Sequence, residues 1–172
     1  KKEVFKVDWD ITAAEKSGYE HFMIKEICEE PDVLRSVINS RIKDIKVDIS
    51  DLSIVESEIT NISKIFIVAC GTAYHAGLVG KQIIEKLVRI PVEVDIASEF
   101  RYKNPIINPG DLVIVISQSG ETIDTLFALR EAKRLGAKVL SIVNTVGSSI
   151  AREADNVFYT WAGPEIAVAS TK

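Results

Sequence analysis

The residues best suited to chemistry form one short run at positions 117–122, with the sequence Ser-Gln-Ser-Gly-Glu-Thr. Three hydroxyls and an amide lie beside a glycine, just before an expected helix start. Free N–H groups and the positive end of the helix dipole favour an anion at such a place. Because the run has no Lys or Arg, neutral donors would hold a phosphate, each contributing about 1.5–3 kcal/mol when desolvated. Ordinary N-capping by these hydroxyls is the alternative interpretation.

The elements around this run indicate where it lies in a fold. Residues 112–116 are all aliphatic without alternation, which predicts a strand buried on both faces of a parallel sheet. Residues 123–135 have apolar positions at helical spacing, and Gly136 is placed to end that helix. The run is therefore a turn at the carboxyl end of a strand, where open α/β sheets bind ligands. Both glycine-rich nucleotide signatures are absent from it, which favours phosphate on a small molecule.

A second turn of the same kind precedes it. A strand is predicted over 64–70, followed by Gly71-Thr72-Ala73 and a helix over 74–88. If the two strands are neighbours, both turns lie at one edge of the sheet. Cys70 and His75 flank this turn, but packing and a surface or supporting position explain them better than catalysis.

Further strands are predicted over 92–96, 138–143 and 157–160. Short helices are expected over 98–102, with Ser98 as N-cap, and over 150–154. The latter opens at 147–149, where capping is the default interpretation of the hydroxyls. Alternating strands and helices indicate right-handed crossovers. We expect a three-layer αβα sandwich with a parallel sheet of about five strands.

An arm precedes this core. Residues 1–18 show no clear period and are interpreted as a linker, and a helical arm is expected over 19–62 before the core at 63–172. Within the arm, Pro31 should end or restart a helix over 19–30, and a second helix should begin near Asp32. Residues 42–49 alternate like short strands, and 52–62 could be helical. His21 is expected to be structural or solvated, and Cys28 to be a small core residue.

Composition limits the function classes. The 172 residues carry a net charge of −4, with 47% hydrophobic and 27% charged residues, which is typical of a soluble globular domain. The charge offers no basic footprint for nucleic acid, and no apolar run is long enough for a membrane. Two cysteines form no disulfide framework, so a cytoplasmic setting is expected. The spacing of the histidines and acids predicts no metal site, and no motif predicts an organic cofactor.

The run at 117–122 resembles the phosphosugar loop of sugar isomerase (SIS) domains. Nearly the whole chain is similar to the first SIS subdomain of the glutamine–fructose-6-phosphate amidotransferase family. The matching blocks lie, in order, at 19–27, 70–75, Pro91, 97–102, 117–122, 147–149 and 168–172.

The resemblance implies a set of ligand contacts. It assigns the phosphate of fructose 6-phosphate or glucosamine 6-phosphate to side chains of the central loop, to Thr72 and the Ala73 backbone, and more weakly to Val168. The loop residues are Ser117, Gln118, Ser119 and Thr122. The family usually has serine at position 73, so one hydroxyl is missing here. Arg101 could clamp a phosphate, but a structural role is the preferred interpretation.

The resemblance also implies what the chain lacks. The family converts fructose 6-phosphate and glutamine to glucosamine 6-phosphate, but none of its catalytic residues can be placed here. Its glutaminase domain, to which 1–18 would be the linker, and its second SIS subdomain are not found. The first residue is Lys1, so we expect part of a longer enzyme, inactive by itself, whose family forms homodimers.

Two other functions stay open. A non-catalytic phosphosugar sensor, the ligand-binding half of a transcription regulator, would keep the same loop and fold. The block at 19–27 favours the enzyme. A plain α/β scaffold with capped turns would have no affinity for sugar phosphates.

Overall fold

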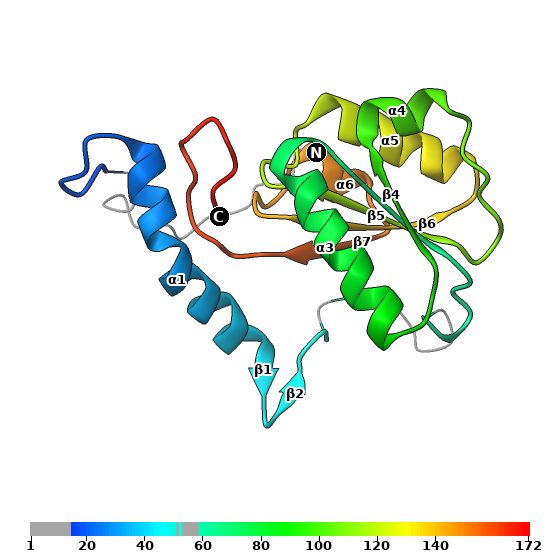
Figure 1. The fold of residues 1–172 in the computed structure, drawn as a ribbon, viewed down its shortest axis with the longest axis horizontal. Coiled ribbons are helices and arrows are strands. Elements are labelled where there is room, and N and C mark those ends of the chain that lie inside the picture. Colours follow the sequence, from blue (N-terminus) through cyan, green and yellow to red (C-terminus); the bar gives the residue numbers. More distant parts are fainter. Residues whose placement is uncertain (1–14, 51, 53–58) are drawn as a thin grey trace, which may run out of the picture. The chain divides into compact units, whose positions relative to one another are not determined.

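The structure is a computed structural model and describes residues 15–50, 52 and 59–172 (Figure 1). The chain divides into two compact units, residues 1–51 with 160–172, and residues 52–159. Most of the expected linker at 1–18 and of the expected helix at 52–62 lies outside the described residues. Each unit is described by itself.

A five-stranded parallel sheet forms the centre of the unit at 52–159. Its spatial order is β4 (Val92–Ile96), β3 (Ile65–Ala69), β5 (Leu112–Ser117), β6 (Lys138–Val143) and β7 (Asn156–Tyr159). Ala69 pairs with Ile116, and Ile116 pairs with Ile142, so three strands end at nearly the same level. The chain order reverses at β3, which makes the boundary between β3 and β5 the topological switch point. The predicted parallel sheet of about five strands is confirmed.

The helices cover both faces of this sheet. α3 (Gly71–Leu87) packs against β3 and β4 on one face. α4 (Ala97–Tyr102), α5 (Ile123–Arg134) and α6 (Ser149–Glu153) cover the other. The three-layer αβα sandwich is confirmed, although α3 begins three residues earlier than predicted. α4 also begins earlier than expected: Ile96 is its N-cap, so Ser98 lies within the helix rather than capping it.

Successive side chains of β3 point alternately into the two hydrophobic cores, one on each face of the sheet. Phe66 and Val68 belong to the larger core, together with Phe100 of α4 and Leu129 of α5. Ile67 points to the opposite face, into the smaller core beneath α3. Since both faces are buried, β3 and β5 need apolar residues at successive positions, and this is why their sequences do not alternate. Burial of each large side chain contributes about 1.5–3 kcal/mol.

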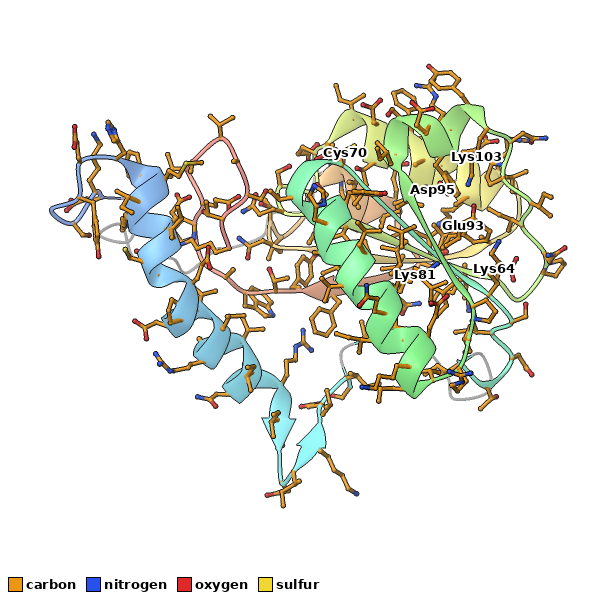
Figure 2. All side chains as sticks on the ribbon, viewed as in Figure 1. Lys64, Cys70, Lys81, Glu93, Asp95 and Lys103 are labelled. Atoms are coloured by element: carbon orange, nitrogen blue, oxygen red, sulfur yellow. The ribbon has the colours of Figure 1, made fainter. Side chains whose placement is uncertain are left out.

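The edge strand β4 carries a charge cluster (Figure 2). Glu93 accepts hydrogen bonds from Lys64, at 2.6 Å, and from Lys103, which also pairs with Asp95. Lys81 donates to the Val92 carbonyl at 2.7 Å. Charged side chains on an edge strand disfavour pairing with another chain.

The other unit is built on α1 (Phe22–Arg41), which is followed by a short antiparallel pair, β1 (Ile42–Lys43) and β2 (Lys46–Val47). The hairpin confirms the strand-like alternation expected over 42–49. The expectation that Pro31 ends or restarts the helix is wrong, because α1 continues through it. Ile27, whose carbonyl would accept the missing N–H, is exposed, so water can satisfy that group.

One more expectation for this unit is wrong. Cys28 is exposed and not a core residue, and the buried residues of α1 are Lys25 and Glu26 instead. The segment 160–172 contains no helix or strand. No helix of the described residues is long and apolar enough to cross a membrane.

Candidate functional site

The turn after β5 is folded by its own hydroxyls. Ser117 is 3% exposed, and its Oγ lies 2.9 Å from Thr122 Oγ1 and accepts the Gly120 N–H at 3.1 Å. Ser119 Oγ accepts the Glu121 N–H at 3.2 Å. These bonds close the turn so that the chain passes from the strand directly into α5.

Plain capping does not account for these hydroxyls. Thr122 is the N-cap residue of α5, but its side chain makes no capping hydrogen bond and engages Ser117 instead. α5 has acidic Asp124 in its first turn and Lys133 and Arg134 in its last, which complements the helix dipole. α5 begins directly after Thr122, so its N-terminus lies close to Ser119, which is exposed to solvent.

The turn after β3 lies next to it, as predicted from adjacent strands. Thr72 and Ala73 fall in the first turn of α3, with Thr72 exposed and Ala73 partly buried. Thr125 Oγ1 of α5 lies 3.9 Å from Cys70 Sγ, so the two turns approach each other at the switch point. The position of Cys70, where β3 passes into α3, is labelled in Figure 2. Because β3 and β5 are parallel neighbours that end at nearly the same level, six of the predicted site residues lie at this one edge.

A third turn, between β6 and α6, supports the central one. The Asn144 and Thr145 N–H groups donate to the Gln118 carbonyl at 3.0 and 3.3 Å, and Ile150 donates to the Gly120 carbonyl at 3.0 Å. Ser148 is buried and its Oγ has no hydrogen-bond partner. A Cβ added to Gly120 would lie 2.0 Å from that Oγ, and Gly120 has φ +65°, so only glycine fits.

Glu121 is the residue of this turn whose role the sequence did not reveal. Its Oε1 accepts the Ser149 N–H at 2.7 Å, at the start of α6. Capping was the expected use of the hydroxyls at 147–149, but Ser148 makes no side-chain cap and Glu121 takes that place. Hydrogen bonds from Ser149 hold the pKa of the Glu121 carboxyl below its usual value, with Arg152 adding to the effect.

Val168 belongs to the other unit. Its side chain is fully exposed, in a turn whose base is held by Glu26 of α1. Glu26 is 2% exposed and accepts the N–H groups of Ile166 and Ala167, at 2.6 and 3.1 Å, and the Thr171 hydroxyl at 2.9 Å. No sequence motif indicates this anchor.

Arg101 has the structural surroundings that were expected. Its guanidinium lies 4.2 Å from the centre of the Phe127 ring and 5.2 Å from that of Tyr102. His21 is exposed and pairs with Glu20, which agrees with a solvated position. Among the described residues, no group of three or more His, Cys, Asp and Glu side chains could hold a metal ion.

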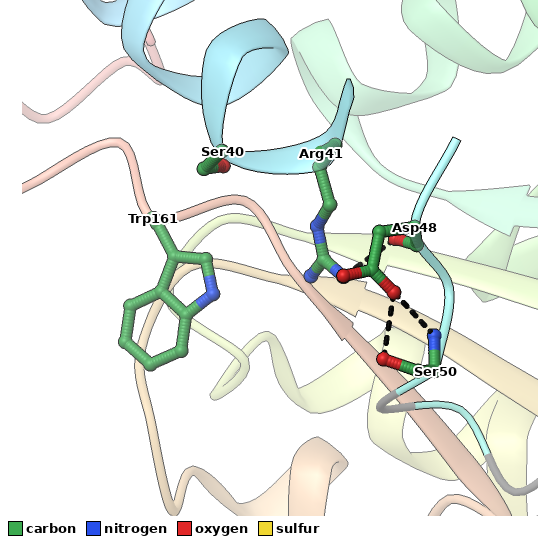
Figure 3. A pocket seen from close by; sticks show the side chains of 5 residues that line it. All are labelled: Ser40, Arg41, Asp48, Ser50 and Trp161. Carbon is green, nitrogen blue, oxygen red and sulfur yellow. Dashed lines mark hydrogen bonds between the residues drawn. The ribbon is translucent and has the colours of Figure 1, made fainter. Parts of the chain in front are cut away.

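A pocket of about 210 Å³ lies in the unit built on α1 (Figure 3). It is lined by Ser40, Arg41, Asp48, Ser50 and Trp161. Asp48 accepts hydrogen bonds from Lys43 and from both the N–H and the hydroxyl of Ser50, and these lower its pKa. The Asp48 carboxylate is therefore already hydrogen-bonded to Lys43 and Ser50. None of the predicted site residues lines this pocket.

Comparison with known proteins agrees with this fold. Residues 58–172 match the SIS domain family. The chain belongs to this family.

Its relatives are longer proteins. The glutamine–fructose-6-phosphate aminotransferase [isomerizing] of Clostridium tetani is 66% identical over 175 residues, covering 100% of this chain and 28% of the relative. That of Clostridium acetobutylicum is 64% identical over 174 residues, with 99% and 28% covered. The chain therefore spans about 28% of the length of these relatives.

A solved structure supports the same relationship. The C-terminal domain of glucosamine-fructose-6-phosphate aminotransferase from Francisella tularensis superimposes with a TM-score of 0.85 at 42% identity. The match covers 91% of this chain and 44% of that one.

Proposed function

We propose that this chain is the first SIS subdomain of a glutamine–fructose-6-phosphate aminotransferase and that it binds the phosphate of the sugar. The whole enzyme would convert fructose 6-phosphate and glutamine to glucosamine 6-phosphate and glutamate. The observation that carries the proposal is the hydroxyl-rich turn after β5, placed beside the turn after β3 at the switch point. The relatives' names and their identity of 64–66% over nearly the whole chain support the substrate.

In this proposal the donors have distinct parts. Ser119, Thr122 and the Gln118 amide contact phosphate oxygens, while Thr72 and the Ala73 N–H approach from the neighbouring turn. Ser117 contributes chiefly by holding the turn, because its hydroxyl is buried and already shared between Gly120 and Thr122. Val168 is proposed as a separate backbone contact. The groups that move protons would lie in the second SIS subdomain or a neighbouring chain, so this chain by itself would be inactive.

The phosphosugar-sensor alternative is less well supported. A sensor would need to share only the fold and the loop, whereas the similarity to the aminotransferases extends through residues 1–57, outside the SIS match. The wider partners of the proposal follow from the aminotransferase family: a glutaminase domain, a second SIS subdomain and a homodimer.

The test is a titration of the chain with fructose 6-phosphate, glucose 6-phosphate and, as a phosphate-free control, fructose, followed by amide NMR. We expect shifts centred on residues 117–122 and 71–73 with both phosphates and none with fructose. Ser119→Ala should weaken binding about tenfold, in line with the loss of one donor to a charged oxygen. Ser40→Ala, an exposed serine on α1, is the matched control. Absence of shifts at millimolar sugar phosphate would contradict the proposal.

A further inference from the structure

A negative charge within the proposed phosphate loop needs an explanation. Glu121 lies between Gly120 and Thr122, and a carboxylate near a bound phosphate repels it. If Glu121 were a simple surface acid, its removal would strengthen phosphate binding.

The geometry directs this charge elsewhere. Glu121 Oε1 accepts the Ser149 N–H at 2.7 Å, at the start of α6. Arg152 of the same helix donates to Ser149 Oγ at 3.1 Å and also to the Gly147 carbonyl. The carboxylate is therefore held by a backbone N–H of the β6–α6 segment, and the positive charge of Arg152 nearby helps to lower its pKa.

The same segment supports the turn through its backbone. Ile150 donates to the Gly120 carbonyl, and Asn144 donates to the Gln118 carbonyl, each at 3.0 Å. Ser148 packs so closely on Gly120 that no side chain fits between them. Glu121 adds a hydrogen bond from its charged side chain to these neutral contacts. This bond is made from the segment between Gly120 and the start of α5.

We propose that Glu121 is a positioning residue that fastens the phosphate-binding turn to the N-terminus of α6. This inference rests on the proposed function. By this bond Glu121 keeps the donors of Ser119 and Thr122 at the spacing that a phosphate requires. Its benefit to binding exceeds the repulsion that its charge imposes.

The sign of the mutational effect tests this inference. In the titration described above, Glu121→Ala should weaken fructose 6-phosphate binding about tenfold. Glu121→Gln keeps a carbonyl acceptor for the Ser149 N–H and should bind within about threefold of the wild type. Glu121→Asp keeps the charge but shortens the side chain, so it should resemble the alanine variant. The Ser149 amide resonance should move in the alanine and aspartate variants even without ligand.

The matched control is Asp124→Asn, which removes one negative charge from the exposed first turn of α5. It should leave phosphate binding unchanged or strengthen it. Alanine or aspartate variants of Glu121 that bind as tightly as the wild type, or more tightly, would overturn the inference while leaving the phosphate site intact. If the wild type itself shows no shifts, the proposed function fails, and the role of Glu121 fails with it.

Discussion

Gly120 shows how closely single residues determine the candidate site. It has φ +65°, and the space where a Cβ would lie is filled by Ser148. Ser117 and Ser119 then accept the N–H groups of Gly120 and Glu121, so the turn is folded by hydroxyls that the sequence also suggested as ligand donors.

Gly120→Ala should therefore destabilise the protein by about 2–4 kcal/mol, because a strained φ and a steric overlap act together. Gly136→Ala is the control, since Gly136 has φ +89° with open space around it and should show the backbone strain alone, about 1 kcal/mol. Urea unfolding measures both. The double variant Gly120→Ala, Ser148→Gly should recover part of the lost stability. If Gly120→Ala and Gly136→Ala lose equal stability, the steric overlap at Gly120 is relieved by local movement.

The sequence could indicate candidate site residues by their type but not their partners. The hydroxyls of the run at 117–122 pointed to an anion or to caps, and the fold shows a further use, the closing of the turn itself. Ser117 is the clearest example of a partner that the sequence could not indicate. It is only 3% exposed because it is the last residue of β5 and still pairs with Val143 within the sheet. Glu121 looked like any surface acid, since its partner Ser149 lies 28 residues further along the chain.

At the scale of secondary-structure elements, α1 is linked to a distant segment by one buried carboxylate. Glu26 accepts hydrogen bonds from Ile166, Ala167 and Thr171, which lie at least 140 residues further along the chain. Nearby Glu29 pairs with Lys25 and Lys172; burial alone would raise its pKa, but these lysines outweigh burial and lower it. The segment 165–172 is held in place by these contacts, without a helix or strand of its own.

Glu26→Ala should destabilise the unit built on α1 by at least about 1–3 kcal/mol, because it leaves two backbone N–H groups without their acceptor. Glu26→Gln should have a smaller effect, since one carbonyl acceptor is kept. Hydrogen exchange of the Ile166 and Ala167 amides is the direct measurement, and both should exchange faster in the alanine variant. Glu30→Ala on the same helix is the control, and unchanged protection of the two amides would refute the anchoring role.

The elements themselves were largely predictable. Strands buried on both faces require successive apolar residues, and such runs marked β3 and β5 with little ambiguity. Element ends were less certain: α3 starts earlier than its apolar period because Gly71-Thr72-Ala73 forms its first turn. The prediction at Pro31 was wrong because a proline removes one helix N–H donor and causes a local clash. A long helix with an exposed face can tolerate both.

For the whole molecule, ionised carboxylates hold the elements together. The pKa values of several are lowered by hydrogen bonds and ion pairs that persist only in the folded state. Among the described residues of the unit at 52–159, these are Glu93, Glu121, Glu131 and Glu153. Arg130 holds Glu153 by two bonds, at 2.8 and 2.6 Å, and so joins α5 to α6.

Acidification should therefore unfold the protein despite its net charge of −4. A carboxyl with a lowered folded pKa stabilises the native state fully above its unfolded pKa of about 4.3, and this contribution is lost as pH falls through the folded pKa. Relief of long-range repulsion opposes this, but salt screens it beyond about 8 Å at 0.15 M. Lys103 has the opposite sign: burial lowers its pKa, yet Asp95 and Glu93 outweigh burial and raise it. Its contribution is present below about pH 10.4 and is lost at higher pH.

We expect a plateau of unfolding free energy near neutral pH and a decline below about pH 4.5, measured by urea titration at 0.15 M salt. Glu153→Gln should lower the plateau slightly, by up to about 1 kcal/mol, and flatten the acid limb, because the pair is partly exposed. A stability that rises steadily from pH 7 to pH 4 would show instead that net charge, and not these local pairs, governs the acid response.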